Sequence, residues 1–574
     1  MGVATTRWLD RVAAAVGALD QAPVLFERAE DIPNGGVLCA LAALLSFGLL
    51  SQATSHFPRP KGYYPMESIF LLLAYLALGR VPSLEQLRYQ PAGEWGKLLG
   101  LDRIPEVKTL RDKIGVLSDD QERTARWSGA LAKEWMSRDV EAVGVLLIDG
   151  HVRVYHGEAA QLPRRYISRE RLCLRGTTDY WVNAMDGAPF FCVTKAVDPG
   201  LQKTLEHEIL PRLLQDVPGQ PTNEDLAAEP LRHRFTLIFD REGYSPQLFE
   251  RLKAQRVAIL TYHKHPGQPW AQEEFAEHTL AHTNGETSTA QLAERGTCLS
   301  NGLWVREIRC LSDNGHQTAI LSTDYRSSLS RSAAAMFARW NQENFFKYMR
   351  EHYGLDRLVE YGVNPLPDTT RIVNPTWRAL DSQVRSTAAK LSRAQAAFGS
   401  HTLGAQENEP DSAARHEEKK GAALHALETT QSELDTLKTR RKDTPKHIQL
   451  KDLTHEQRIT QLRGARKQFV DTIKLIAYRA ETALVQLARE TLRRHDDARS
   501  FIRGLFATSV NLRPDPAHNQ LHVEIHGQTN PIHDKTLHAL CDELNATETL
   551  YPGTELRLVY TPIRSAVFPA GQDV

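Results

Sequence analysis

Four absences narrow the classes of protein to which this chain can belong. Its 574 residues include only six cysteines with no C-x2-C pair, which argues against a zinc finger and a disulfide framework and favours a reducing cytoplasm. Lysine and arginine together equal aspartate and glutamate, 70 against 70, so overall charge gives no support to a polyanionic partner. No apolar run reaches the roughly 20 residues that span a bilayer. The amino-terminal segment also lacks the pattern of a cleavable signal peptide.

The apolar residues that are present are sufficient for a large core. They make up 41% of the chain, and a chain of this length is expected to form three or more structural units. The apolar stretches at 37–50 and 69–75 predict buried helices. We therefore expect a soluble multidomain protein.

Two acids follow short apolar runs. Asp149 ends the run 143–148, and Asp240 ends the run 235–239. Such runs predict buried strands whose carboxyl ends meet at one edge of a sheet, so Asp149 and Asp240 are expected to lie together. Either acid taken alone is more often a turn or cap residue.

A third acid, Glu343, lies in a segment that predicts a helix over 339–350. Three carboxylates in one dry pocket repel one another unless a cation is present, which favours a pair of Mg²⁺ ions and chemistry at a phosphodiester. Arg339, Lys347 and Arg350 share the helix face of Glu343 and would hold phosphates. The alternative is a solvated face with ordinary ion pairs. The residues expected to dock this helix on a core are Met336, Phe337 and Trp340.

The segments between the acids predict a definite order of elements. Asp186-Gly187 between two apolar stretches predicts a hairpin with a type I′ turn. The order is strand, hairpin, helix, strand, helix, strand, a long interruption, and the Glu343 helix. The expected strands are 143–148, 180–185, 189–193, 235–239 and 257–262, and the expected helices are 204–214 and 246–254.

This order resembles the RNase-H-like catalytic core of the DDE transposases, which move bacterial insertion sequences. One branch of that family has a β-rich insertion before the third acid, and this chain has a candidate insertion at 263–330 with strand-like segments 304–309 and 317–322. The branch also has Tyr-x2-Arg-x3-Glu-x6-Lys around that acid. The corresponding residues here are Met336, Arg339, Glu343 and Arg350, so the tyrosine is absent and the lysine is replaced by a like charge. The resemblance covers 143–361.

The resemblance implies a DNA transposase that cuts insertion-sequence ends and transfers the cut strand into target DNA. Asp149, Asp240 and Glu343 would be both the catalytic residues and the ligands of two Mg²⁺ (or Mn²⁺) ions. The partners would be transposon ends and target DNA, bound by a homodimer at the nucleoid of a bacterial cytoplasm. Three alternatives stay open: an RNase-H-like nuclease that does not join DNA, a domesticated DNA-binding protein without catalysis, and a helical scaffold.

Two further segments carry candidate DNA-binding cations. A basic stretch after Asp149 would neutralise substrate phosphates, although a solvated loop is an equal alternative for each residue. Its members are Arg153, Arg164, Arg165, Arg169, Arg171 and Arg175. In the amino-terminal part, helices are expected at 83–88, 93–99 and 106–117. Lys108 and Arg111 share one face of the last helix, as in a recognition helix, although packing or dimerisation helices show the same pattern.

The carboxyl-terminal third predicts a different architecture. A flexible link at 399–420 would precede a helix at 423–440, and a capping box of Thr454 with Gln457 would open a long helix. An apolar 3–4 alternation along 459–487 predicts that the long helix folds back on the first as a hairpin with basic residues 438–442 at its tip. Strands at 521–525 and 555–560 around a helix at 536–544 predict a small α+β piece.

These expectations together define a multidomain α/β chain. The resemblance assigns its centre to an RNase-H-like mixed-sheet core interrupted by the β-rich insertion. The expected segments are a helical amino-terminal domain at 1–140, the two parts of the core at 141–262 and 331–398, the insertion at 263–330, a linker at 399–420, a helical hairpin at 421–500 and a small α+β region at 501–574.

Overall fold

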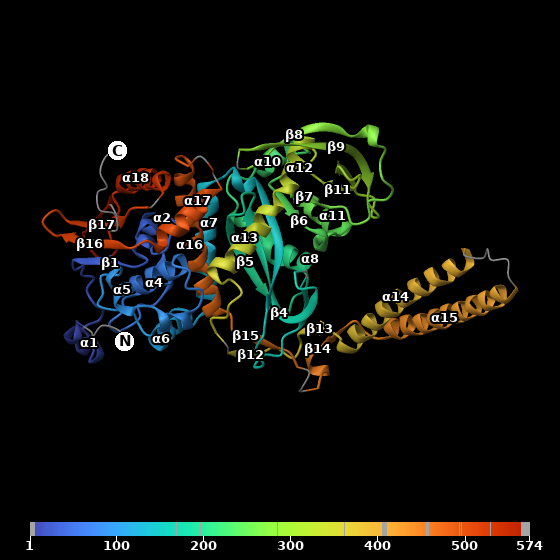
Figure 1. Ribbon diagram of the computed structural model, residues 1–574, viewed down its shortest axis with the longest axis horizontal. Helices are drawn as coiled ribbons and strands as arrows, with labels where there is room; N and C mark the ends of the chain where they lie inside the picture. Colours follow the sequence, from blue (N-terminus) through green and yellow to red (C-terminus); the bar gives the residue numbers. More distant parts are fainter. Residues whose placement is uncertain are drawn as a thin grey trace. The chain divides into compact units, whose positions relative to one another are not determined.

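The chain folds into two compact units of mixed α/β structure (Figure 1). The computed structural model describes residues 6–563 apart from 168, 196, 284, 361, 404–409, 455–457, 493, 495 and 529; for 401–403 and 410–416 it describes the backbone only. Unit 1 comprises Met1–Tyr155, Arg164–Gly362 and Leu462–Val574, and unit 2 comprises His156–Pro163 and Val363–Gln461. None of the described helices combines the length and apolarity that a membrane span requires.

A ten-stranded sheet forms the centre of unit 1. Its order is β3-β4-β2-β6-β7-β11-β10-β9-β8, and β5 also pairs with the long strand β4. Strands β2, β6 and β7 are parallel, whereas β4 and β5 are antiparallel to their neighbours. The first six strands are β2 (Val145–Val154), β3 (Arg164–Ile167), β4 (Leu172–Ala184), β5 (Pro189–Lys195), β6 (Thr236–Phe239) and β7 (Ala258–Tyr262).

The segment expected as an insertion continues this sheet. Its four strands are antiparallel neighbours, and β11 pairs with β7, so the main-chain hydrogen bonding runs unbroken from the first strands into the inserted ones. The strands are β8 (Ala276–Ala281), β9 (Thr287–Cys298), β10 (Trp304–Leu311) and β11 (Gln317–Ser322).

Local signals explain several of the surrounding helices. Pro246 occupies the first turn of α11 (Pro246–Ala254), and the Ser245 side chain accepts a hydrogen bond from the amide of Leu248, which is a typical helix start. Residues 201–216 form α8 (Leu201–Thr204), a π-helical turn at 205–209 and α9 (Leu210–Asp216). After β11 come α12 (Leu329–Phe337) and α13 (Arg339–Tyr353).

The β4–β5 hairpin forms where it was expected, but its turn is not type I′. That turn needs positive φ at both central residues, and in this connection only Gly187 has it, at +89°. The Asp186 carboxylate instead accepts a hydrogen bond from the amide of Ala188, so an aspartate-capped four-residue connection replaces the expected two-residue turn.

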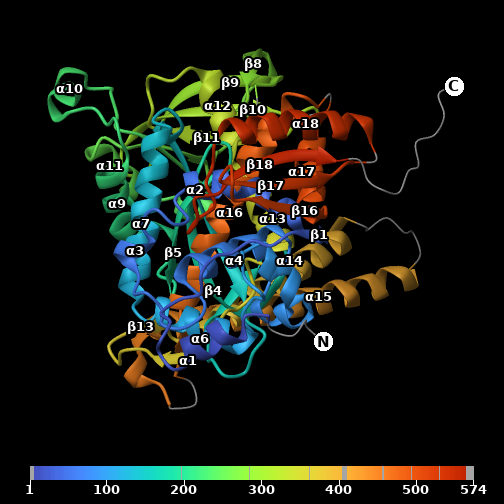
Figure 2. The same ribbon diagram turned by 90° about the vertical axis from the view of Figure 1, so that its left-hand side faces the viewer.

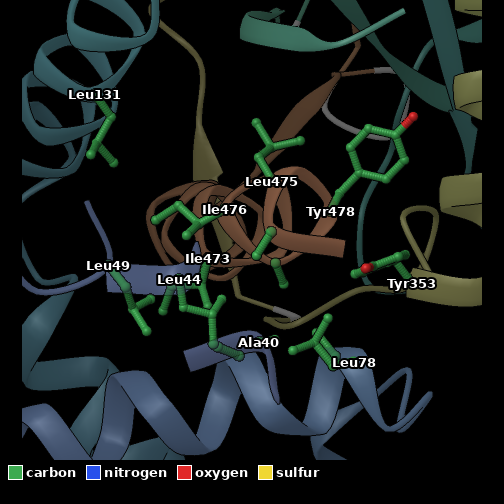
Figure 3. Close-up of a cluster of buried hydrophobic side chains, with 14 of the residues drawn as sticks. Ala40, Leu44, Leu49, Leu78, Leu131, Tyr353, Ile473, Leu475, Ile476 and Tyr478 are labelled. Carbon is green, nitrogen blue, oxygen red and sulfur yellow. The ribbon is translucent and has the colours of Figure 1, made fainter. Parts of the chain in front are cut away.

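The amino- and carboxyl-terminal parts of unit 1 share one core built around α16 (Ala465–Arg489). This helix packs against α2 (Leu41–Ser46), α4 (Met66–Leu78) and α7 (Gln121–Arg138). Figure 3 looks along α16: Ile473 lies on the side of Leu44 and Ala40, Ile476 points to the side of Leu131, and Leu475 and Tyr478 project from the other side of the helix. The same α7 packs on β5 and α3 (Ala53–His56), as Figure 2 shows, which joins this core to the central sheet.

A second, four-stranded sheet also joins the two ends of the chain. Its order is β1-β16-β17-β18, in which β1 (Ala29–Ile32) pairs antiparallel with β16 (Val510–Asp515). The crossover helix α18 (Pro531–Ala546) connects β17 (Gln520–His526) to the parallel strand β18 (Arg557–Ile563). The segments expected as separate regions at 1–140 and 501–574 are therefore parts of one body, in which α17 (Asp497–Ala507) packs against residues 35–40.

Unit 2 holds a helical hairpin, but its partners differ from the expected ones. The pair is α14 (Pro375–Leu403) with α15 (Pro410–Asp443), closed by a small core of Leu380, Val384, Leu391, Leu434 and Leu437. Small sheets β12–β15 (Val363–Pro365 with Thr460–Leu462) and β13–β14 (Arg371–Val373 with His447–Gln449) lie at its base.

Three expectations about this third of the chain are therefore wrong. Much of the supposed linker 399–420 belongs to α14 and α15, although 404–409 lie outside the described residues. The long helix begins at Ala465 rather than beside Thr454, while Gln457 of the supposed capping box is outside the described residues. The apolar seam expected at 459–487 packs in unit 1 from Phe469 onward, where helices α2, α4 and α7 bury it.

Candidate active site

The register of the central sheet brings Asp149 and Asp240 side by side. Ile148 of β2 pairs with Phe239 of β6, so the two acids occupy the next position on adjacent parallel strands, which lie about 4.8 Å apart. Asp149 does not end its strand as expected, because β2 continues to Val154 in its pairing with β4. The edge that the acids share is nevertheless the end of the β2–β6 pairing.

Helix α13 packs on β2 and brings Glu343 to this edge. The adjacent Gln342 is buried and donates hydrogen bonds to the Asn183 side chain at 2.9 Å and to the Trp181 carbonyl at 3.3 Å. Phe345 and Phe346 pack edge-on against the Trp181 ring. Glu343 lies one helical turn after Arg339, at the side of this docking face, and is exposed.

The residues that dock this part of the chain differ from those expected. Met336 is buried, but it lies on α12 together with Phe337. Trp340 is 66% exposed and contributes no docking surface. The buried hydrophobic residues of α13 are instead Phe345 and Phe346, which pack on Trp181 of the sheet, together with Met349 and with Tyr353, which packs on Tyr478 of α16.

Electrostatics couples the three acids. Burial raises the pKa of Asp149 to about 7, Arg339 opposes that shift, and the negative charges of Asp240 and Glu343 add to it. The Asp149 carboxylate also accepts a hydrogen bond from the amide of Gly150 at 2.8 Å. The guanidinium of Arg339 lies 3.4 Å from its other oxygen. The site therefore holds more negative charge than its one adjacent arginine neutralises.

This donor set fits a hard divalent cation by its chemistry, because three carboxylates supply the oxygen ligands that Mg²⁺ and Mn²⁺ prefer. The geometry is more open than a metal cage. Within the described part of the chain, no group of three or more His, Cys, Asp or Glu side chains is gathered closely enough to hold a metal ion. Asp240 also caps the short turn that follows β6, accepting a hydrogen bond from the Glu242 amide at 2.8 Å.

The cations of α13 have three different environments. Arg339 is buried and paired with Asp149, Arg350 is half-buried, and Lys347 is exposed. The expected stripe of phosphate-binding cations is therefore not uniform. Lys347 alone is exposed to solvent, one turn along the helix from Glu343.

A histidine that the sequence did not single out lies beside the acids. His151 follows Asp149 by two residues and so lies on the same face of β2. Its Nε2 lies 2.6 Å from the Asp356 carboxylate, whose other oxygen is 3.4 Å from Arg169. Burial alone raises the pKa of Asp356, but the hydrogen bond with His151 and the charges of Arg169 and Arg350 hold it below its ordinary value. The sequence signal that could have identified His151 is its position two residues after Asp149, because residues at this spacing share one face of a strand.

The basic stretch after Asp149 is mostly structured rather than a loop. It forms the β3–β4 hairpin, in which Arg164 pairs with Arg175 across the strands. Arg153 is a buried member of an ion pair with Asp179, so it is unavailable to DNA. Arg165 lies 3.5 Å from Asp198. Arg164, Arg169 and Arg171 are exposed.

The amino-terminal helices form as expected, but the basic face is reduced. Helix α6 (Val107–Leu117) buries Leu110, Ile114 and Leu117. Arg111 pairs with Glu85, which leaves Lys108 as the exposed cation of the expected pair.

These features define a multidomain α/β protein with acids gathered at one edge of its main sheet. Residues 2–564 match the model of a family described as transposase protein, which is nearly the whole chain. The chain belongs to this transposase family, whose role implies DNA binding and processing of nucleic acid. No curated protein sequence matches it significantly.

Proposed function

We propose that this transposase is of the DDE type. It cuts DNA at insertion-sequence ends and transfers the cut strand into target DNA in a reaction that depends on divalent metal ions. The observation that carries the proposal is the Ile148–Phe239 register, which aligns Asp149 with Asp240 under the helix that bears Glu343. The coupled charges of the three acids support a cation between them.

The strand order also supports an RNase-H-like core. In that fold an antiparallel three-stranded meander is followed by two strands parallel to its first strand. The order β5-β4-β2-β6-β7, with β2, β6 and β7 parallel, matches this arrangement. Strands β8 to β11 would then be the β-rich insertion that precedes the third acid.

Each residue of the site would have its own role in this reaction. Asp149, Asp240 and Glu343 would hold two Mg²⁺ or Mn²⁺ ions, which would supply activation of the attacking oxygen and stabilisation of the leaving one. Arg339 fixes the Asp149 carboxylate, while Lys347 and Arg350 hold phosphates of the bound strand. Water first breaks a phosphodiester and leaves a 3′-hydroxyl, which then displaces a 3′-oxygen in the target, so one bond forms for each bond broken. A homodimer would hold two paired ends.

The test is incubation of the purified protein with its flanking genomic DNA and a second duplex, with and without Mg²⁺ or Mn²⁺. Wild type should give cuts at defined ends and joined products, and Glu343→Gln should lose both while still binding DNA. Glu351→Gln is the matched control, since it makes the same change at an exposed acid of the same helix and should keep activity.

Each other outcome has a definite meaning. Cutting without joining would replace the proposal with an RNase-H-like nuclease. Metal-independent binding without cutting would indicate a domesticated DNA-binding protein, an outcome that the open arrangement of the acids would then explain. Unchanged activity of Glu343→Gln would remove Glu343 from the site.

A further inference from the structure

Unit 2 is electrically polarised along its helical hairpin. The base of the hairpin, residues 363–382 and 436–461, holds nine lysines and arginines against five aspartates and glutamates. The remaining part, 383–435, holds six against eight. Although the whole chain has no net charge, the base of the unit 2 hairpin therefore carries an excess of positive charge.

Two separate segments of the chain bring these cations together. The carboxyl-terminal end of α15 leads into β14, which pairs with β13 near the start of α14, as Figure 1 shows. The amide of Asn374 donates to the carbonyl of Lys446, and the amide of Lys451 donates to the carbonyl of Asp368. The exposed cations of this base include Arg371, Arg440, Lys442, Lys446 and Lys451.

Internal pairing accounts for only part of this charge. Asp381 binds Arg441 at 2.8 Å and Arg385 at 2.9 Å, and Asp368 binds Arg458 at 3.3 Å. Within the described residues, Arg440 and Lys442 form no ion pair. Favourable interaction with the end of the α15 dipole is confined to the last turn of that helix, so it does not explain Lys446, Lys451 or Arg371.

We propose that the base of the unit 2 hairpin is a binding surface for the phosphate backbone of duplex DNA. Exposed cations of one sign repel one another, and a polyanion relieves that repulsion by exchanging condensed counterions for lysine and arginine. Lys446 also lies over the Trp377 ring at 5.2 Å, which holds one of the cations against the surface. The acidic remainder of the hairpin would be kept away from the duplex.

This surface rests on the proposed DNA transposase function but is separate from its acids. Arg440, Lys442, Lys446 and Lys451 come from none of the segments that carry Asp149, Asp240 or Glu343. The contact would be independent of DNA sequence, because backbone phosphates carry no sequence information directly. The surface therefore suits target DNA or flanking DNA better than a specific end sequence.

The test measures binding of the full-length protein to a duplex of unrelated sequence over a series of salt concentrations without divalent ions. Arg440→Gln/Lys442→Gln should weaken binding and reduce the slope of log K against log salt by about two. Adding Lys446→Gln and Lys451→Gln should reduce it by about four. The matched control, Lys419→Gln/Lys420→Gln, removes two cations from the same helix in its acidic part and should leave the slope unchanged.

The two proposals fail in different ways. An unchanged slope in both base variants would overturn this inference, and so would an equal loss in the control. If the wild type cuts DNA while the base variants bind normally, the catalytic proposal stands and this one falls. If the base variants show the reduced salt dependence of binding but neither they nor the wild type cut DNA, the phosphate-binding surface is supported and the catalytic proposal falls.

Discussion

Among single residues, Lys474 of α16 has an environment that disfavours its charged form. It is buried, and its amine donates a hydrogen bond to the Gly354 carbonyl at 3.3 Å. Burial and the nearby charge of Lys467 lower its pKa to about 7. The folded protein therefore binds this proton less tightly than the unfolded chain, whose lysines have a pKa of about 10.4.

Stability should consequently rise between pH 7 and pH 10, where the unfolded chain binds more protons than the folded one. Lys474→Met should stabilise the protein at pH 7 by on the order of 4 kcal/mol and remove most of this rise. Urea denaturation at the two ends of the range measures both effects. Lys133→Met, at an exposed position of α7, should change neither, and a rise retained in Lys474→Met would contradict the assignment.

Arg153 gives a second prediction at this scale. Its guanidinium and the Asp179 carboxylate are both buried and lie 2.9 Å apart in one of their contacts. Arg153→Met leaves that carboxylate without its partner and should cost about 3–5 kcal/mol in the free energy of unfolding. Arg153→Met/Asp179→Leu should recover most of the loss. Chemical denaturation gives both values, and a single variant as stable as wild type would show that the pair is not formed.

The same residue marks a limit of sequence reasoning. Arg153 was expected to face DNA because six arginines follow Asp149 within a short segment. Its partner Asp179 lies 26 residues away on β4, and the distance between them depends on a strand register that no local pattern fixes. The acids Asp149 and Asp240 were easier to place, since each follows an apolar run that predicts its own strand.

Among the elements, those with a strong local signal were predicted well. Helix α11 has the expected bounds, and the strands after Asp149 form in the expected order. The packing partners of a helix were harder to predict. An apolar stripe predicts that one face of the helix is buried, but it does not identify the element that covers this face. The stripe of α16 fits a hairpin as well as it fits the crowded core that the helix occupies.

Helix α13 depends on α16 in a way that can be tested. Glu481 is fully buried and accepts hydrogen bonds from the Tyr348 and Tyr353 hydroxyls of α13, while Arg80 donates to it at 2.8 Å. Glu481→Leu leaves the Arg80 charge partly buried and unpaired and should destabilise the protein by about 3–5 kcal/mol. Thermal unfolding measures the loss.

Gln486→Leu is the control for that substitution, because its side chain is exposed on the same helix. It should change the free energy of unfolding by less than about 0.5 kcal/mol. Equal losses of stability in Glu481→Leu and Gln486→Leu would show that a leucine substitution destabilises α16 wherever it is made. The hydrogen bonds to Glu481 would then not be the cause.

For the whole molecule, we expect stability to depend on the contact between residues 35–40 and α17. A Cβ added to Gly36 would overlap the backbone carbonyl of Leu505 in α17, which no rotamer change relieves. Gly36→Ala should therefore cost about 3 kcal/mol or more. Gly504→Ala has open space and lies inside α17, so it should be neutral or stabilising by up to about 1 kcal/mol. Denaturation of both variants tests the contact, and similar stabilities would refute it.

That contact has a consequence for biosynthesis. Helix α4, whose side chains are almost all buried, packs against α16, and β1 pairs with β16, so the first part of the chain cannot complete its core until residues beyond 510 have left the ribosome. At about 5–20 residues per second this delay is on the order of tens of seconds. During that time the nascent chain exposes apolar surface that the finished fold buries, and such surface is prone to aggregation.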